Sequence, residues 1–223
     1  LGFLQTMTLQ NRTEPIEIYG PDGIEEFIAT NMKVMNFGLS FPVLITSVNN
    51  GLVVNEEKYE VYACEAEHSV TVFSYLFKEK EKPGEFYPDK AIALGVPKGK
   101  LWHTLQCGEE VTIENKTIKP SQVMGPNIAG KKIGVSGDTR PTKELEEFFN
   151  ACDYLIFDST FSDELKEKAV ESGHSTAKEA ATLAQNAKVL NLILTHFSAR
   201  YNDDKVLLEE AKSIHNSVIA AND

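Results

Sequence analysis

Three ionisable residues stand directly after short runs that are typical of buried strands. These residues are Asp138, Asp158 and His196, all in the second half of the chain. Open α/β sheets bind ligands outside the carboxyl ends of their parallel strands. Two carboxylates and an imidazole at one such edge predict a metal site or an acid–base site, although any one of them alone also suits a turn or a cap. Asp138 follows a glycine that permits a tight turn, and its carboxylate could bridge two metal ions that polarise a phosphoryl oxygen.

Two further histidines lie in polar, turn-rich surroundings where an imidazole is free to do chemistry. His68 follows Glu-Ala-Glu at the start of a β-rich run, and His174 lies in a Gly-His-Ser-Thr loop before a predicted helix. His103 follows a tryptophan and His215 belongs to a predicted helix, so we assign both of these a structural role.

The Gly-His-Ser-Thr loop suits phosphate chemistry. A helix N-terminus presents unpaired N–H donors and the positive end of the helix dipole, and the hydroxyls of Ser175 and Thr176 add donors. His174 could protonate a leaving oxygen, and Asp158 could hold its ring in the right tautomer. Arg200 could complete a phosphate clamp. Taken alone, the loop is more typical of a simple helix cap than of a phosphate-binding site.

The second half of the chain predicts alternating strands and helices that would position these residues. Its last helix carries Leu207, Ala211, Ile214 and Val218 on one face, which predicts packing on the sheet. The predicted strands are 131–137, 154–157 and 189–195, and the predicted helices are 141–149 and 177–187, the second with a capping box formed by Thr176 and Glu179.

The first half is richer in β-strands. Asn49-Asn50-Gly51 is typical of a hairpin turn, so we expect a meander around it, and a second hairpin is expected at 111–118 with its turn at Asn115. The other predicted elements are strands at 15–19, 43–48, 51–54, 58–64 and 68–77 and a helix at 24–31. Together the two halves fit an α/β fold, a two-sheet sandwich flanked by helices.

Charge is distributed unevenly along the chain. The net charge of −11 has the wrong sign for nucleic-acid binding by bulk electrostatics. Residues 78–100, however, contain six lysines against four acidic residues, a balance of +2 that leaves −13 for the rest. The stretch is polar and turn-rich, which predicts a protrusion. Its charge fits either a solvated surface loop or a small phosphate-binding arm.

Composition narrows the class of protein. A chain of 223 residues, 42% of them hydrophobic, is long enough for one sizeable core. No run approaches the length of a membrane span. Cys64, Cys107 and Cys152 are odd in number, widely spaced and without a Cys-x-x-Cys pair, which argues against disulfides and against a thiolate zinc site. We therefore expect a reducing, cytoplasmic location.

The order of these motifs closely resembles one family, tRNase Z, the tRNA 3′-end-processing endonucleases of the metallo-β-lactamase superfamily. The Gly-His-Ser-Thr loop together with Asp-Ser-Thr-Phe narrows the resemblance from the superfamily to tRNase Z. The matching motifs are Glu-His-Ser-Val at 67–70 with Phe-Ser-Tyr at 73–75, Gly-Asp-Thr-Arg-Pro at 137–141, Phe-Asp-Ser-Thr-Phe at 157–161, Gly-His-Ser-Thr at 173–176 and Leu-Thr-His-Phe-Ser-Ala-Arg-Tyr at 194–201. The resemblance implies a metallo-β-lactamase αββα sandwich, N-terminally truncated in this chain, with a protruding arm at about 78–101.

The resemblance also implies roles for individual residues. His68 would bind the first of two zinc ions, Asp138 would bridge both, and His196 would bind the second. His174, supported by Asp158, would give a proton to the departing 3′ oxygen of a precursor tRNA.

The resemblance implies partners as well. The arm, with Lys98, Gly99 and Lys100 among its residues, would grip the tRNA. Two copies of the chain would form a homodimer.

Three departures from the family pattern qualify these expectations. The family's first metal cluster, His-x-His-x-Asp-His, is absent from the 223 residues; we expect it upstream of Leu1 and expect this fragment alone to be inactive. Phe157 and Asp158 stand where many members have His-Glu, and Lys98-Gly99-Lys100 stands where many have Pro-Gly-Pro. Two alternatives stay open: another phosphodiesterase of this fold, or a non-catalytic RNA-binding subunit if the cluster is genuinely absent.

Overall fold

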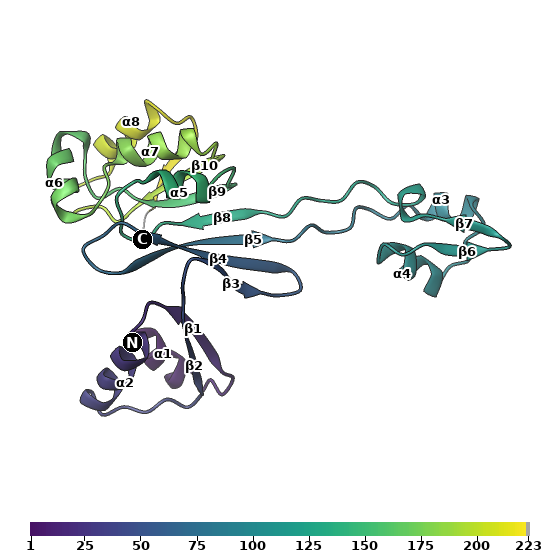
Figure 1. The fold of residues 1–223 in the computed structure, drawn as a ribbon, viewed down its shortest axis with the longest axis horizontal. Helices are drawn as coiled ribbons and strands as arrows, with labels where there is room; N and C mark the ends of the chain where they lie inside the picture. The colour runs from purple at the N-terminus through teal and green to yellow at the C-terminus, as the bar shows by residue number, and fades with distance from the viewer. Residues whose placement is uncertain (222–223) are drawn as a thin grey trace. The chain divides into compact units, whose positions relative to one another are not determined.

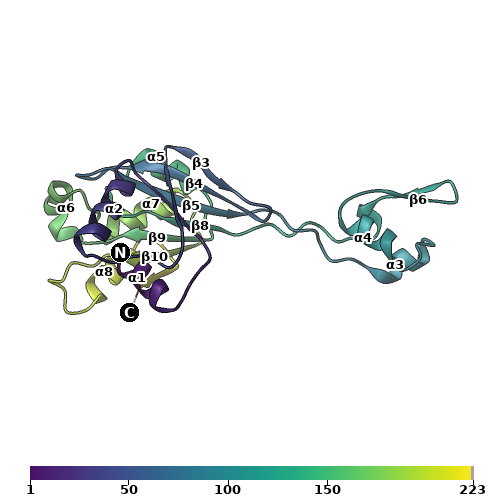
Figure 2. The same ribbon diagram turned by 90° about the horizontal axis from the view of Figure 1, so that it is seen from below.

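A seven-stranded sheet forms the framework of the larger of two structural units, in a computed structural model that describes residues 1–221. This unit comprises residues 1–56, 60–77 and the described residues from 132 onward. In spatial order its strands are β11 (Val218–Ala220), β10 (Asn191–Thr195), β9 (Tyr154–Asp158), β8 (Lys132–Val135), β5 (Val72–Glu79), β4 (Tyr59–Ala66) and β3 (Gly51–Asn55). Figures 1 and 2 label the strands from β10 to β3.

Strands β8, β9, β10 and β11 run parallel to one another. The register pairs Val135 with Ile156 and Thr195 with Asp158, so the carboxyl ends of β8, β9 and β10 meet at one edge. The predicted strand–helix–strand frame is therefore confirmed. The helices of this region are α5 (Lys143–Phe148), α6 (Lys166–Ser172), α7 (Ala177–Asn186) and α8 (Lys205–Lys212), with a 3₁₀ helix at Asp163–Leu165.

The core of this region lies between the sheet and helices α5, α7 and α8 (Figure 1). Phe149 and Phe157 are fully buried and meet edge to face, with ring centroids 6.3 Å apart. Helix α7 buries Ala177, Ala180, Ala181 and Ala184, whose small side chains let the helix pack closely on the sheet. The predicted capping box is present: Thr176 Oγ1 accepts from Glu179 N at 3.1 Å, and the Glu179 carboxylate accepts from Thr176 N at 3.1 Å.

The N-terminal residues form a second, two-stranded sheet with its own apolar cluster around Leu4, Ile28 and Phe41. Its strands pair in parallel, as a crossover helix between them allows. The elements are α1 (Gly2–Leu9), β1 (Ile16–Gly20), α2 (Ile24–Val34) and β2 (Val43–Ser47).

This arrangement corrects the predicted meander. Strand β2 pairs with β1 and not with β3, so the Asn49-Asn50-Gly51 turn joins two sheets instead of closing a hairpin. The expected antiparallel pairing holds for β3 and β4, which carry a register shift between Leu52 and Val54.

The smaller unit comprises residues 57–59 and 78–131, a range that includes the residues of the predicted arm. The arm itself stays a prediction. Val111, Ile118 and Val123 complete an apolar core with Ala91 and Leu105, so the later residues are needed to bury the earlier ones. Its elements are α3 (Pro88–Ala93), α4 (Lys100–Gln106), β6 (Val111–Ile113), β7 (Lys116–Ile118) and a 3₁₀ helix at Pro120–Gln122.

The predicted hairpin within the smaller unit is confirmed. Strands β6 and β7 pair in antiparallel fashion. Glu114 and Asn115 join them with φ angles of 47° and 65°, the positive values that a tight two-residue hairpin turn requires.

The last predicted helix is wrong at its C-terminal end. Helix α8 buries Leu207 and Ala211 as expected, but it ends at Lys212, and Val218 belongs to strand β11. Between them, the buried His215 ring uses Nε2 to contact Val189 O at 2.9 Å, a structural contact. Among residues 1–221, no helix has both the length and the apolarity that crossing a membrane requires.

Candidate metal and acid–base site

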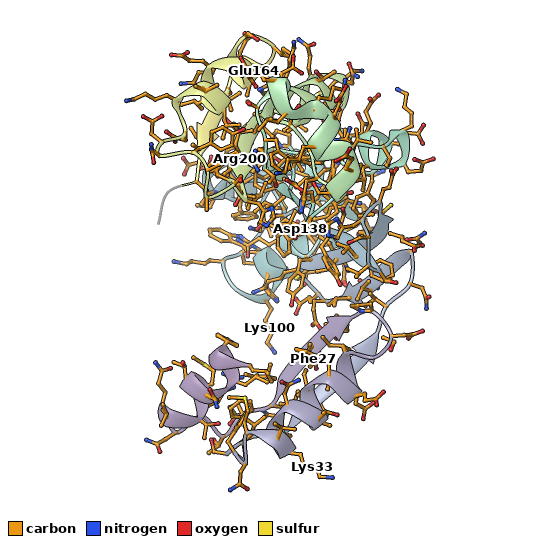
Figure 3. All side chains as sticks on the ribbon, turned by 90° about the vertical axis from the view of Figure 1, so that its left-hand side faces the viewer. Phe27, Lys33, Lys100, Asp138, Glu164 and Arg200 are labelled. Atoms are coloured by element: carbon orange, nitrogen blue, oxygen red, sulfur yellow. The ribbon has the colours of Figure 1, made fainter. Side chains whose placement is uncertain are left out.

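The parallel strands bring the three predicted strand-end residues to one edge of the sheet. Asp138 lies in the loop after β8, Asp158 ends β9, and His196 directly follows β10. Figure 3 labels Asp138 and also Arg200, which lies farther along the segment that leaves β10. His196 Nε2 lies 3.7 Å from Asp138 Oδ2, and His196 Nδ1 lies 3.8 Å from Asp158 Oδ1.

Asp158 is the buried anchor of the site, with no exposed surface. Its Oδ2 accepts hydrogen bonds from Thr139 N at 3.0 Å and from His174 Nδ1 at 2.8 Å. Its Oδ1 accepts from Thr160 N at 3.0 Å and from Thr160 Oγ1 at 2.7 Å. The carboxylate thus holds the His174 ring with the proton on Nδ1, which leaves Nε2 to take part in proton transfer.

His196 is oriented through Thr160. The Thr160 hydroxyl gives its one proton to Asp158, so it accepts at 2.8 Å from His196 Nδ1. The Nε2 lone pair of His196 then faces Asp138. The backbone of His196 has φ = 63°, a left-handed value that a residue with a side chain adopts at a cost of about 1–3 kcal/mol, and such strained residues are concentrated at functional sites.

His68 is oriented by the loop that carries His174. Its Nδ1 donates to Gly173 O at 2.8 Å, because a carbonyl oxygen can only accept. Gly173 has φ = 74°, and a Cβ at this position would lie 2.7 Å from His68 Nδ1, so the loop needs glycine there. The rings of His68 and His174 have centroids 4.8 Å apart, and those of His174 and His196 are 4.9 Å apart.

The imidazole and carboxylate groups at this edge have the chemistry of zinc ligands, and His174 belongs to both groups of potential ligand atoms that lie close together. Potential ligand atoms of His68, Asp138 and His174 lie within 4.8 Å of one another, as do those of Asp158, His174 and His196. Neutral imidazole nitrogen and carboxylate oxygen are usual zinc ligands. Metal-binding histidines normally donate their other ring N–H to a fixed acceptor, as the Nδ1 atoms of His68 and His196 do here. The ligand roles of His68, Asp138 and His196 themselves stay predictions.

The two hydroxyl groups that we predict to contact substrate make hydrogen bonds within the protein. Ser175 is buried and its hydroxyl donates to Thr139 O at 2.6 Å, while the Thr176 hydroxyl accepts from Glu179 N. Both hydroxyls therefore serve the geometry of the loop in this structure, and their predicted contact with substrate stays a prediction.

The predicted cationic contacts are exposed. Arg200 donates from Nε to Ser198 Oγ at 3.0 Å, and its guanidinium lies 5.1 Å from the centroid of the Phe161 ring. Lys98, Gly99 and Lys100 are exposed in the smaller unit, where Gly99 caps α4 with a φ of 135° that only glycine adopts readily.

The residues that hold the reacting groups in place carry no signal of that role in the sequence. Thr160 and Thr139 lie within two of the family motifs, and Arg140 forms an ion pair with Glu179. The guanidinium donates to Glu179 Oε2 at 2.8 Å and to Oε1 at 2.6 Å, and both side chains are nearly buried. Burial raises the pKa of Glu179, but the hydrogen bond from Arg140, the Thr176 N–H and the nearby positive charges outweigh it and lower that pKa overall. The capping motif could have located Glu179, but it does not identify Arg140 as its partner.

The chain is similar to known proteins along its whole length. A model of the beta-lactamase superfamily domain matches residues 89–197. Ribonuclease Z from Nitrosopumilus maritimus is 61% identical over all 223 residues, which span 75% of that protein. Ribonuclease Z from Methanosarcina acetivorans is 42% identical over the whole chain, which spans 73% of that protein.

Solved structures share the fold. The crystal structure of human tRNase Z, short form, aligns with a TM-score of 0.63 at 23% identity, covering 100% of this chain and 70% of that one. The metallo-beta-lactamase fold protein YhfI from Bacillus subtilis aligns with a TM-score of 0.62 at 16% identity, covering 99% and 68%. The sequence identities and these structural matches lead to one conclusion: the chain belongs to the ribonuclease Z family, with the mixed α/β fold of the metallo-β-lactamase superfamily.

Proposed function

We propose that this protein is a zinc-dependent endoribonuclease that hydrolyses the phosphodiester at the 3′ end of precursor tRNA and so removes the 3′ trailer. One observation carries the proposal: the imidazole of His174, held by the buried Asp158, lies beside the candidate metal ligands His68, Asp138 and His196. A proton donor and metal-binding groups at one sheet edge are what phosphodiester hydrolysis needs. Membership of the ribonuclease Z family supports precursor tRNA as the substrate.

The residues divide the chemistry between them. His68, Asp138 and His196 would hold zinc, which when bound supplies Lewis-acid stabilisation of the phosphoryl group and an activated water. His174 protonates the departing 3′ oxygen from Nε2. Asp158 fixes the tautomer of His174 and stabilises its protonated form before the proton is transferred.

Substrate binding is assigned to exposed cations. Arg200 contacts a phosphate next to the reacting group, and Lys98 and Lys100 in the smaller unit bind the tRNA backbone. The protein as a whole has a net charge of −11 and repels a polyanion. Binding of tRNA therefore requires a local group of lysines. We further propose that the protein works as a homodimer in the cytoplasm.

Replacing His174 with alanine tests the proposal. In protein expressed from its natural reading frame, His174→Ala is expected to slow precursor-tRNA cleavage by about 10²–10⁴-fold, the usual contribution of a general acid. Zinc content per chain should not change. His103→Ala, which removes an exposed imidazole of the smaller unit, is the matched control and should cleave normally. Loss of zinc from His174→Ala would show that His174 is a ligand and not the proton donor.

The substrate is tested separately. Precursor-tRNA cleavage should continue in the presence of excess cyclic nucleotide, since the proposed substrate is RNA. Strong competition would instead support a phosphodiesterase that acts on cyclic nucleotides. Protein that binds RNA but contains no zinc and cleaves nothing would support a non-catalytic subunit.

A further inference from the structure

One short loop controls the position of two imidazoles in the candidate site. Its Gly173 carbonyl accepts the Nδ1 proton of His68, and its next residue, His174, places its own ring against Asp158. The two contacts are made by successive residues, so a small shift of the backbone at His174 would displace the proposed proton donor while the bond of His68 to Gly173 O is kept. The backbone between these two contacts must be held in place.

Arg140 holds this backbone in place through hydrogen bonds. Its Nη1 donates to the main-chain carbonyl of His174 as well as to Glu179 Oε2, and its Nη2 donates to Glu179 Oε1. Its main-chain N–H donates to Glu67 O at 2.9 Å, directly before His68. The Arg140 side chain is only 12% exposed, so these bonds face little competition from water.

Glu179 is fixed in turn. Its carboxylate accepts from Thr176 N at 3.1 Å at the start of α7, and Lys166 Nζ lies 3.6 Å from its Oε1. The guanidinium is thus clamped between a rigid helix terminus and the loop it supports. A planar guanidinium can donate to a carboxylate bidentately and to a carbonyl at the same time, whereas an ammonium cannot reproduce this fork.

We propose that Arg140 is a positioning residue for the proton-transfer step, acting through the backbone of His174 with Glu179 orienting its guanidinium. The inference rests on the proposed role of His174 as proton donor. If Arg140 has this role, the loss of activity in an Arg140 variant should depend on the leaving group of the substrate. A ribose 3′ oxygen needs a proton to leave, whereas p-nitrophenolate is stable enough as an anion to leave without one.

The experiment compares two substrates in the wild type, Arg140→Lys and His174→Ala, with protein expressed from its natural reading frame. For Arg140→Lys we expect kcat on precursor tRNA to fall by about 10–100-fold, the effect of misplacing a reacting group, with KM within about twofold. Hydrolysis of bis(p-nitrophenyl) phosphate should stay within about threefold, and zinc content should not change. Lys178→Met removes the partner of Asp163 at the start of the same helix α7 and should leave both rates unchanged.

Each outcome separates the inference from the proposed function. If His174→Ala slows both substrates equally, the proton-donor role fails, and the positioning role fails with it. If His174→Ala is selective but Arg140→Lys slows both substrates equally or loses zinc, Arg140 is only a structural residue. If Arg140→Lys slows neither substrate, the guanidinium is dispensable and the inference is overturned.

Discussion

The two units of this chain use their polar side chains in opposite ways. In the larger unit, Asp158 is fully buried, and every oxygen of its carboxylate accepts hydrogen bonds from the protein. In the smaller unit, apolar side chains such as Leu105 and Ile118 form the core, while Lys98 and Lys100 are exposed. Proton transfer needs atoms held at fixed distances, whereas attraction to a polyanion needs only charge within reach. We therefore expect substitutions in the larger unit to affect the chemical step and substitutions in the smaller unit to affect the binding of tRNA.

The largest effect is expected from Asp158→Asn. An amide NH2 at the Oδ2 position would face the Thr139 N–H and no longer favour the Nδ1-protonated form of His174, and an NH2 at the Oδ1 position would face the Thr160 N–H. In either orientation the amide lacks the negative charge that stabilises protonated His174. In serine proteases the equivalent change lowers kcat by about 10⁴-fold, and we expect a fall of about 10²–10⁴-fold in precursor-tRNA cleavage. Asp163→Asn, in a partly exposed pair with Lys178, is the control. Asp158→Asn activity within threefold of wild type would contradict the anchoring role.

A smaller effect is expected from Gly173→Ala. Its Cβ would lie 2.7 Å from His68 Nδ1, so the ring must move away from the carbonyl that orients it. Loss of such an outer contact lowers metal affinity by about 10–100-fold, which competition with a zinc chelator would measure. Gly23→Ala is the matched control, because Gly23 has a φ of 89° but open space around its Cβ position. Zinc affinity of Gly173→Ala equal to that of Gly23→Ala would contradict the orienting role of the contact between His68 and Gly173.

Substitution of the exposed lysines of the smaller unit should affect the binding of precursor tRNA alone. We expect the double variant with Lys98→Ala and Lys100→Ala to raise KM for precursor tRNA by several-fold and to flatten its salt dependence, because each cation that contacts a phosphate releases a counterion. The kcat for precursor tRNA and the hydrolysis of bis(p-nitrophenyl) phosphate should stay unchanged. A fall in kcat with constant KM would contradict the division of labour between the units.

The smallest effect concerns acid stability. Because Arg140 and its neighbours lower the pKa of Glu179 in the folded state, Glu179 contributes stability that is present above the ordinary glutamate value of about 4.3. That contribution is lost as the pH falls below this value toward the lowered pKa of the folded state. Urea unfolding at a series of pH values should show Glu179→Gln less stable than wild type at pH 7, with the difference shrinking in acid. A difference independent of pH would contradict the lowered pKa.

The local sequence was sufficient to predict the frame of the site. Short strand-like runs identify β8, β9 and β10, and parallel pairing then requires Asp138, Asp158 and His196 to share an edge. The capping motif of α7 was equally local, since Thr176 and Glu179 are one helical turn apart.

Contacts between distant parts of the chain could not be predicted in this way. The pairing of β2 with β1 depends on the crossover through α2, and the full extent of the smaller unit depends on which apolar residues share its core. Arg140 and Glu179 are 39 residues apart, and the hydrophobic pattern of the sequence does not show that their side chains pair. Thr160 gains its role only when β9 and β10 place it between Asp158 and His196.

The central claim is that this sheet edge holds a zinc-dependent phosphodiesterase centre. Its most direct test is a crystal structure of zinc-loaded protein expressed from its natural reading frame, with anomalous difference maps recorded at the zinc edge. We expect zinc peaks in contact with His68 Nε2, the Asp138 carboxylate and His196 Nε2, with His174 outside the ligand set. Zinc bound by His174, or no zinc at this edge in active protein, would contradict it.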